Sequence, residues 1–244
     1  MSLIRLTSIQ KFYRLGRVDV RALRDVDLEI ASGEMVALAG PSGSGKTTLL
    51  NLIGCIDKPT AGTIVIDGTD VTDVPLHKLA LTRRDTIGYV FQTFNLIPVL
   101  TAYENVEYPL LLQGVPRKRR DVAVRQWLEQ VGLADKAKHR PDELSGGQRQ
   151  RVAIARAMVG APKLVLADEP TANLDSDTGA QILDLMSRLN EETGCTLIFA
   201  THDAAVMARA SRVVSLRDGA IADDVLRITA DADRADNLVA MGAM

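Results

Sequence analysis

The chain has few aromatic residues, only two cysteines and no marked excess of charge of either sign. Phenylalanine, tyrosine and tryptophan make up 4% of its 244 residues, which gives no sign of the aromatic platforms on which nucleic acids stack. The formal net charge is −2, so no overall field attracts nucleic acid or an anionic membrane. These absences predict that nucleic acid is not a partner.

Long apolar runs are also missing. No stretch of about 18 apolar residues predicts a membrane span, and the N-terminal residues lack the apolar core of a signal peptide. Cys55 and Cys195 lie far apart in apolar segments, which predicts buried free thiols and suits a reducing compartment. We therefore expect a soluble, cytoplasmic protein whose membrane role, if any, comes through a partner.

Hydrophobic patterning predicts an α/β fold with a mostly parallel, doubly wound sheet, because buried apolar strands alternate with amphipathic helices. The hydrophobic fraction of 46% is enough for a sizeable core. Strands are predicted at residues 4–6, 26–30, 35–39, 62–68, 87–91, 163–167, 196–200 and 212–216, and helices at 47–56, 101–112, 117–132, 148–159 and from about 177. Thr101 and Glu104 fit a capping box at the start of one helix.

A glycine-rich loop between a predicted strand and a predicted helix fits the phosphate-binding pattern Gly-x-x-x-x-Gly-Lys-Thr. Its glycines allow the backbone N–H groups to turn inward as an anion nest, and the following helix adds its positive end. Lys46 is expected to reach the β- and γ-phosphates of a nucleotide, and the Thr47 hydroxyl to ligate Mg²⁺. The loop consists of Gly40, Pro41, Ser42, Gly43, Ser44, Gly45, Lys46, Thr47 and Thr48.

Two adjacent acids, Asp168 and Glu169, end a buried strand. Ligands of open α/β sheets bind beyond the carboxyl ends of the strands, and successive strand residues point to opposite sides. We expect Asp168 to support Mg²⁺, directly or through water, and Glu169 to orient the attacking water as general base.

A third motif, Leu-Ser-Gly-Gly-Gln at positions 144–148, lies twenty positions before Asp168. Ser145 can cap a helix starting at Gly146, and Gly146 and Gly147 leave N–H groups open at its positive end. This predicts a second phosphate-binding surface, or simply a capped helix start.

Together, the three motifs in this order and at these spacings resemble the ATP-binding cassette (ABC) ATPases, and the resemblance covers roughly residues 3–220. It implies a RecA-like P-loop NTPase fold with an N-terminal antiparallel β subdomain. It further implies an inserted α-helical subdomain at about 93–158, within one domain over 1–225 whose core and β subdomain comprise 1–92 and 159–225. Residues 226–244 would form a tail or an extra element. The resemblance also implies ATP and Mg²⁺ as ligands and a head-to-tail homodimer in which Ser145, Gly146, Gly147 and Gln148 of one subunit face the ATP of the other.

Further site residues follow from the resemblance, position by position. Tyr13 corresponds to the aromatic residue that stacks on adenine, with Phe12 as its competitor. Gln92 corresponds to the glutamine that touches Mg²⁺ and the water, and His202 to the histidine that contacts the γ-phosphate. Asp175 corresponds to the residue that reaches across the dimer, although it can also cap the next helix.

Several stretches, including 52–57, 83–92 and 95–98, resemble the branch that contains lipoprotein-releasing, macrolide-exporting and cell-division ATPases. This implies an integral membrane permease as partner and a peripheral location on the cytoplasmic face of the inner membrane. Apolar residues at 94–100 would form part of the permease groove or of the core. The basic run 117–120 would be a solvated helix start or contact lipid headgroups.

The alternative function is a non-transport ABC ATPase of DNA repair or translation, which the short insert and the single cassette disfavour.

Overall fold

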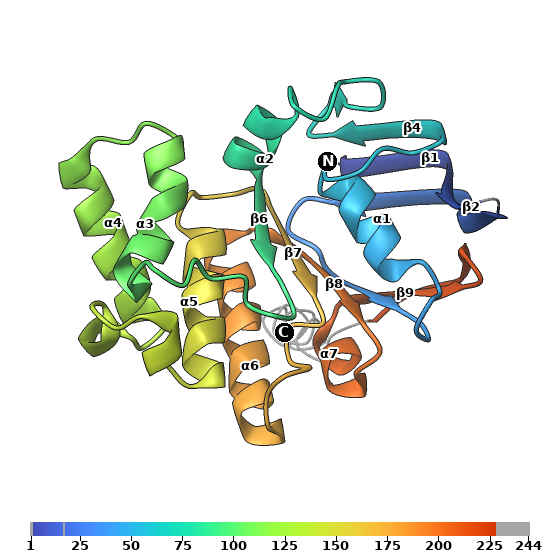
Figure 1. The fold of residues 1–244 in the computed structure, drawn as a ribbon. Helices are drawn as coiled ribbons and strands as arrows, with labels where there is room; N and C mark the ends of the chain where they lie inside the picture. The colour runs from blue at the N-terminus through green and yellow to red at the C-terminus, as the bar shows by residue number, and fades with distance from the viewer. Residues whose placement is uncertain (1, 17, 228–244) are drawn as a thin grey trace, which may run out of the picture.

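A computed structural model describes residues 2–16 and 18–227 of the chain. These residues form two β-sheets with helices packed between and beside them (Figure 1). The larger sheet has the strand order β10-β9-β3-β8-β7-β6, and the smaller has the order β2-β1-β4-β5. None of the helices in this described part has the length and apolar character that a membrane crossing needs.

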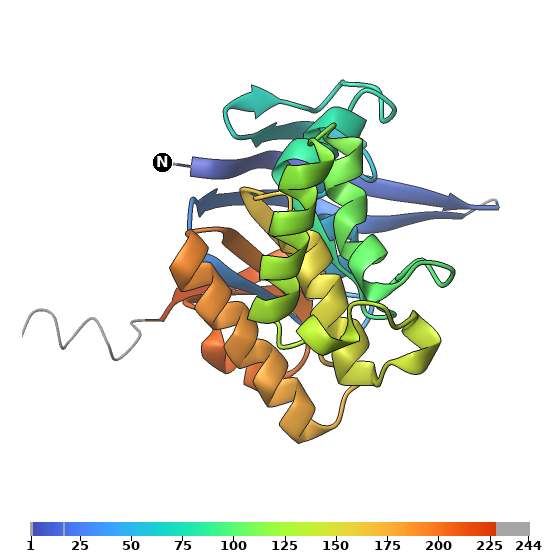
Figure 2. The ribbon, with the colours of Figure 1, turned by 90° about the vertical axis from the view of Figure 1, so that its left-hand side faces the viewer.

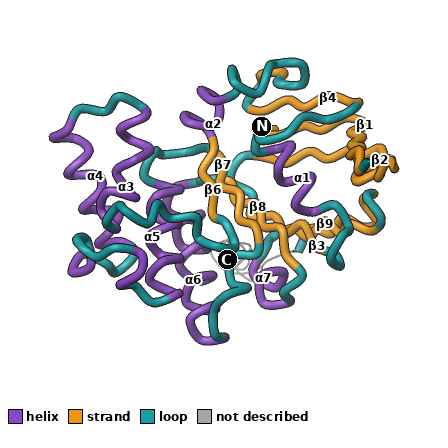
Figure 3. The backbone as a smooth tube through the Cα atoms, in the orientation of Figure 1, coloured by secondary structure: helices purple, strands orange, loops and turns teal. Residues whose placement is uncertain are grey.

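The larger sheet is parallel from β9 to β6, with one antiparallel edge strand, β10. Its central strands are covered on both faces. Along β7, Leu164 and Leu166 join one hydrophobic cluster while Val165 and Ala167 join the other. The loops that carry the predicted site residues follow the carboxyl ends of these strands (Figure 3). The strands are β3 (Met35–Ala39), β6 (Ile87–Val90), β7 (Leu164–Asp168), β8 (Thr196–Thr201), β9 (Arg212–Arg217) and β10 (Ala220–Leu226).

The smaller sheet is antiparallel and lies over α1, which packs between the two sheets (Figure 1). Leu49, Leu50, Leu52 and Ile53 of α1 are buried in the cluster that joins them. The sheet consists of β1 (Ser2–Leu15), β2 (Val18–Ala31), β4 (Ala61–Ile66) and β5 (Thr69–Asp70). The predicted antiparallel β subdomain is therefore confirmed.

The other hydrophobic cluster joins the opposite face of the larger sheet to a layer of helices (Figure 2). Ile182, Leu185, Met186 and Leu189 recur every one to three positions along α6, and all four are buried there. The helices are α1 (Lys46–Ile53), α2 (Ala80–Thr86), α3 (Ala102–Leu112), α4 (Arg117–Gln130), α5 (Gly146–Met158), α6 (Ser176–Thr193) and α7 (Ala204–Arg209). Short 3₁₀ turns, η1 (Ala134–Lys136) and η2 (Pro141–Glu143), precede α5.

The observed elements differ from the predictions in several places. The helix predicted at 47–56 ends at Ile53 with Gly54 as its C-cap, because Cys55 takes a left-handed φ of 56°. The N-terminal strands are much longer than predicted, and α2, α7, β5 and β10 were not predicted at all. The predicted tail begins within β10, since that strand runs to Leu226; residues 228–244 lie outside the described part. The boundary of the helical subdomain stays a prediction, because α5 packs against both α3 and β6.

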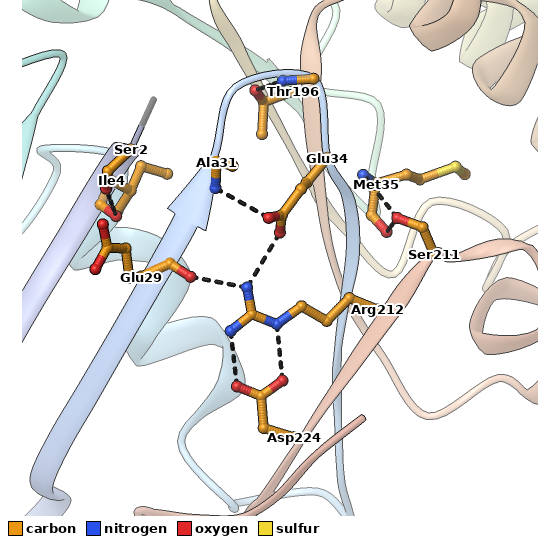
Figure 4. Close-up of polar contacts among 11 residues, drawn as sticks. Ser2, Ile4, Glu29, Ala31, Glu34, Met35, Thr196, Ser211, Arg212 and Asp224 are labelled. Atoms are coloured by element: carbon orange, nitrogen blue, oxygen red, sulfur yellow. Dashed lines mark hydrogen bonds and ion pairs between the residues drawn. The ribbon is translucent and has the colours of Figure 1, made fainter. Parts of the chain in front are cut away.

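Arg212 ties the edge of the larger sheet to the end of β2 (Figure 4). Its guanidinium donates to both carboxylate oxygens of Asp224 at 2.7 Å, to Glu34 at 3.1 Å and to the Glu29 carbonyl at 2.8 Å. Only 14% of its side chain is exposed. One cation thus connects β9, β10 and the turn between β2 and β3.

Candidate functional site

The loop between β3 and α1 takes backbone conformations that require glycine. Gly40 has φ 148° and Gly45 has φ 102°. A Cβ atom at Gly40 would lie 2.3 Å from the Leu216 carbonyl oxygen, and one at Gly45 would lie 2.8 Å from the Ala22 carbonyl oxygen. Because either would collide with backbone, these two positions fix the shape of the loop.

Two polar side chains are enclosed by this loop. Lys46 is only 7% exposed, and its ammonium donates to the carbonyls of Gly40 at 2.7 Å and Pro41 at 3.0 Å. The Ser44 hydroxyl oxygen is buried and has no hydrogen-bond partner among the described residues. Such a group costs about 1–3 kcal/mol when left unpaired. A phosphate oxygen would satisfy it, so the loop residues fit the predicted ligand.

The strand that carries Asp168 brings this carboxylate to the start of α1. The Thr47 hydroxyl donates to Asp168 Oδ1 at 3.3 Å. Burial raises the pKa of the Asp168 carboxyl, and the Thr47 hydroxyl acts in the opposite direction. Adjacent hydroxyl and carboxylate oxygens are hard ligands, as Mg²⁺ prefers, so Thr47 and Asp168 fit the predicted ion.

Glu169 points away from Asp168, toward the end of β8. It accepts a hydrogen bond from the Thr201 hydroxyl at 3.2 Å, and its Oε1 lies 2.7 Å from His202 Nδ1. The Glu169 side chain is 17% exposed and the His202 side chain 66%. The two adjacent acids therefore have different neighbours, as predicted, but Glu169 lies beyond the end of β7 and takes a left-handed φ of 44° instead of continuing the strand. Their chemical roles stay predictions.

Tyr13, and not its competitor Phe12, lies on the side of β1 that faces the end of α1. The Tyr13 hydroxyl donates to Asp57 Oδ2 at 2.8 Å. Burial and the neighbouring Asp57 raise the pKa of the Tyr13 phenol, while a hydrogen bond with Thr48 of the loop lowers it. Phe12 is 39% exposed, with the Arg21 guanidinium 5.4 Å from its ring centroid.

A second group of predicted residues gathers at the starts of α5 and α6. Ser145 caps α5 as predicted: its hydroxyl accepts from Gln148 N, and the Gln148 side chain accepts from Ser145 N. A Cβ at Gly147 would lie 2.4 Å from Thr178, so glycine permits α5 to pack closely on α6. Asp175 caps α6 by accepting from Thr178 N at 2.9 Å, and this hydrogen bond lowers its pKa.

Gln92 joins this second group through its backbone. The Asn173 side chain donates to the Gln92 carbonyl at 2.8 Å, while Gln92 itself is exposed. The structure thus forms one cluster from the loop at 40–48, Tyr13, Asp168, Glu169 and His202. It forms another from 92, 145–148 and 173–178.

Two supporting residues were missed by sequence reasoning. Thr201 holds Glu169, and its position beside His202 at a strand end was the available signal. Arg156 of α5 donates to the carbonyls of Asn95 at 2.5 Å and Phe94 at 2.8 Å, two residues with left-handed φ. Burial lowers the pKa of Arg156 to about 10. Helical periodicity places this arginine on α5 but gives no indication of a partner some sixty residues away.

The apolar segment 94–100 and the basic run 117–120 each contain both partly buried and exposed residues. In the first, Leu96 packs against the core, whereas Val99 is 71% exposed. Within the basic run, the first three residues are exposed as a solvated helix start. Arg120 is the exception, because it pairs with Glu107 at 2.8 Å and only 17% of its side chain is exposed.

Comparison with known proteins places these clusters in a family. Residues 23–172 match the family model described as ABC transporter. An uncharacterized ABC transporter ATP-binding protein of Thermotoga maritima is 50% identical over 216 residues, which cover 88% of this chain and 92% of that protein. The macrolide export ATP-binding/permease protein MacB 1/2 of Paracoccus denitrificans is 47% identical over 222 residues. That match covers 91% of this chain but 33% of the exporter.

A solved structure agrees with the sequence comparison. It is the dimeric structure of a post-hydrolysis state of the ATP-binding cassette MJ0796 bound to ADP and Pi, a protein of Methanocaldococcus jannaschii. The TM-score is 0.86 at 44% identity, with 93% of this chain and 99% of that chain covered. The fold expected from the resemblance is therefore confirmed.

Proposed function

This chain belongs to the ABC transporter ATP-binding family, and on that premise we propose that two copies of it enclose two ATP molecules and drive a separate membrane permease. Its reaction is the hydrolysis of ATP to ADP and phosphate, coupled to transport. Transport is favoured over a role in DNA repair or translation by its likeness to macrolide-exporter ATPases.

In this proposal the loop at 40–48 binds the phosphate chain. The loop's backbone N–H groups and the Ser44 hydroxyl donate to phosphate oxygens, and the Lys46 ammonium exchanges the carbonyls of Gly40 and Pro41 for the β- and γ-phosphates. Thr47 and Asp168 would hold Mg²⁺, which would neutralise the phosphate charge. Gln92, whose backbone belongs to the second group of residues, would add its exposed side chain to the same ion. Tyr13 stacks on the adenine.

The arrangement around Glu169 carries the proposal for hydrolysis. Glu169 leaves the strand on the side opposite Asp168, where Thr201 and His202 hold its two carboxylate oxygens. There it accepts a proton from the attacking water and orients that water toward the γ-phosphate. His202, whose side chain is largely exposed, contacts the γ-phosphate.

Replacing this carboxylate tests the assignment. Glu169→Gln keeps the shape of the side chain but removes the base, so ATP hydrolysis is expected to fall about 10²–10⁴-fold. ATP binding persists, and the variant accumulates as an ATP-bound dimer in size-exclusion chromatography. Glu191→Gln, at an exposed glutamate near the end of α6, is the matched control. Normal hydrolysis by Glu169→Gln would show that the base lies elsewhere.

The start of α5 supplies the second half of each composite site in the proposed dimer. The capping box satisfies the N–H of Gln148, whereas helix geometry leaves those of Gly146 and Gly147 without an intrahelical acceptor. These N–H groups face the γ-phosphate bound by the other subunit. Asp175 reaches across the same interface.

A groove beside α5 is the proposed binding site for the permease. A cavity of about 200 Å³ there is lined by residues of α2, β6, α3 and α5, including Arg83, Arg84, Tyr89, Leu112 and Arg156. Leu112 is 54% exposed. Exposed apolar surface next to cations suits a short amphipathic segment of a membrane protein. The subunit then lies at the cytoplasmic face of the inner membrane, where its permease extrudes lipid, lipoprotein or drug or transmits motion.

A charge placed in this groove tests the partner assignment. Leu112→Asp is expected to reduce copurification of integral membrane proteins with the tagged subunit about 10-fold or more, because a charge must lose water at the contact. ATP hydrolysis by the isolated subunit stays unchanged. Val122→Asp on α4, equally exposed at 55% but outside this cavity, is the control. If both variants recover the same membrane proteins as the unaltered subunit, the permease binds another surface.

A further inference from the structure

A cluster of two charges and a phenol supports one face of the candidate nucleotide site. Lys11 and Tyr13 of β1 both contact the carboxylate of Asp57, so their side chains lie on the same side of the strand despite a register irregularity between Lys11 and Phe12. The Lys11 ammonium donates to Asp57 Oδ1 at 2.7 Å, and the Tyr13 hydroxyl donates to Asp57 Oδ2 at 2.8 Å. The ammonium also lies 4.8 Å from the Tyr13 ring centroid. Both oxygens of one carboxylate are therefore used to hold this strand segment.

Asp57 itself is fixed to the helix that follows the phosphate-binding loop. Its backbone N–H donates to the Asn51 carbonyl of α1 at 3.3 Å, and its Oδ1 also accepts from Lys58 N at 2.7 Å. Thr60, three residues after Asp57, also contacts β1, because Phe12 N donates to the Thr60 hydroxyl at 3.0 Å. The carboxylate is thus a fixed point between α1 and β1.

The burial of Lys11 shows that the cluster is not a surface ion pair. Lys11 is 9% exposed, and its ammonium also donates to the Lys58 carbonyl at 2.7 Å. Burying an ammonium is costly unless it is paired and hydrogen-bonded. Both conditions are met here, so the phenol of Tyr13 is held by a rigid group rather than by a mobile side chain.

We propose that Asp57 and Lys11 are positioning residues that fix the Tyr13 ring for stacking on the nucleotide's base. This inference rests on the proposed function, in which Tyr13 stacks on adenine. A ring held in place before binding loses less freedom when the base arrives. The support therefore strengthens binding of the nucleoside part and leaves binding of the phosphate chain unaffected.

The test compares two ligands that share a diphosphate, ADP and inorganic pyrophosphate. Each is titrated into the protein in the presence of Mg²⁺, and its affinity is measured by calorimetry. Asp57→Ala is expected to weaken ADP binding about 2- to 10-fold, the worth of one positioning hydrogen bond. Tyr13→Phe keeps the ring but removes the phenol contact, so it should weaken ADP binding by a similar factor. The double variant should be no weaker than the worse single one, and pyrophosphate binding should not change. Asp67→Asn, at an exposed carboxylate paired with Lys163, is the control.

Asp57→Ala leaves the buried Lys11 without its carboxylate and could prevent folding. Tyr13→Phe tests the same contact in that case, because it leaves the pair of Lys11 and Asp57 intact. The positioning role is overturned if Tyr13→Phe binds ADP as tightly as the unaltered protein, or if pyrophosphate and ADP weaken together. Tyr13→Ala separates this result from failure of the proposed function. It should weaken ADP binding about 5- to 100-fold, the worth of one base stack. If Tyr13→Ala leaves the preference for ADP intact, the stacking role itself is wrong.

Discussion

At the residue scale, one step along the chain separates two carboxylates with different surroundings. Asp168 is the last residue of β7, and burial raises its pKa. Glu169 follows with a φ of 44°, a left-handed conformation that costs about 1–2 kcal/mol for a residue with a side chain. Its N–H donates to the Ala200 carbonyl at 2.9 Å, and Thr201 and His202 hold its side chain. These contacts offset the cost, so the backbone turn directs the carboxylate to a defined place.

Residues that carry a chemical group within a motif could be named from the sequence, and their roles stay predictions, whereas the residues that contact and support them could not be named. Lys46, Thr47 and Glu169 were assigned from side-chain chemistry and position in the pattern alone. Asp57 supports Tyr13 from 44 positions away, and Arg156 holds Phe94 from 62 positions away. Such pairs form only after strands and helices pack, and no local periodicity specifies them.

At the element scale, predictions were accurate where the apolar pattern was continuous. The buried strands β3, β7 and β8 were found within a residue or two. In β1 the alternation breaks at irregularities between Leu6 and Ile9 and between Ile9 and Lys11, so a period of two predicts only its first residues. The edge strand β10 is mostly exposed and has two aspartates in the middle of its apolar residues. The Asp218-Gly219 turn before it, with φ values of 50° and 81°, was the available hairpin signal.

The Arg212 network should matter more for stability than its surface position suggests. Arg212→Ala leaves Glu34 and Asp224 without their cation and the Glu29 carbonyl without its donor. We expect the free energy of unfolding, from denaturant titration, to fall by about 1–3 kcal/mol.

Arg5→Ala provides a matched comparison, because Arg5 and Arg212 both contact Glu29 of β2. Arg5 pairs with the Glu29 carboxylate, but both side chains are more than half exposed, at 57% and 56%. An exposed pair is worth about 0–1 kcal/mol, so this variant should unfold almost as the unaltered protein does. Equal losses in the two variants would contradict a structural role for the network.

At the scale of the whole molecule, the candidate site is divided between two places in one chain. The groups predicted to bind phosphate gather at the carboxyl ends of β3, β7 and β8, while the starts of α5 and α6 form the second cluster around Ser145 and Asp175. Packing of Gly147 on Thr178 fixes these two helix starts relative to each other. A rigid donor surface built on α5 and α6 suits a ligand presented by another subunit, which is the reason for proposing a composite site.

The composite site predicts a separation of binding from hydrolysis. Ser145→Arg places a long cation where the other subunit's γ-phosphate must approach, so hydrolysis should be abolished while each monomer still binds ATP. Thr101→Arg is the matched control, because Thr101 caps α3 with the same kind of capping box. Each substitution removes a helix cap worth about 1 kcal/mol, so stability falls similarly in both. Hydrolysis lost in both variants would reflect damaged helices, and loss of monomer ATP binding in Ser145→Arg would contradict a site shared by two subunits.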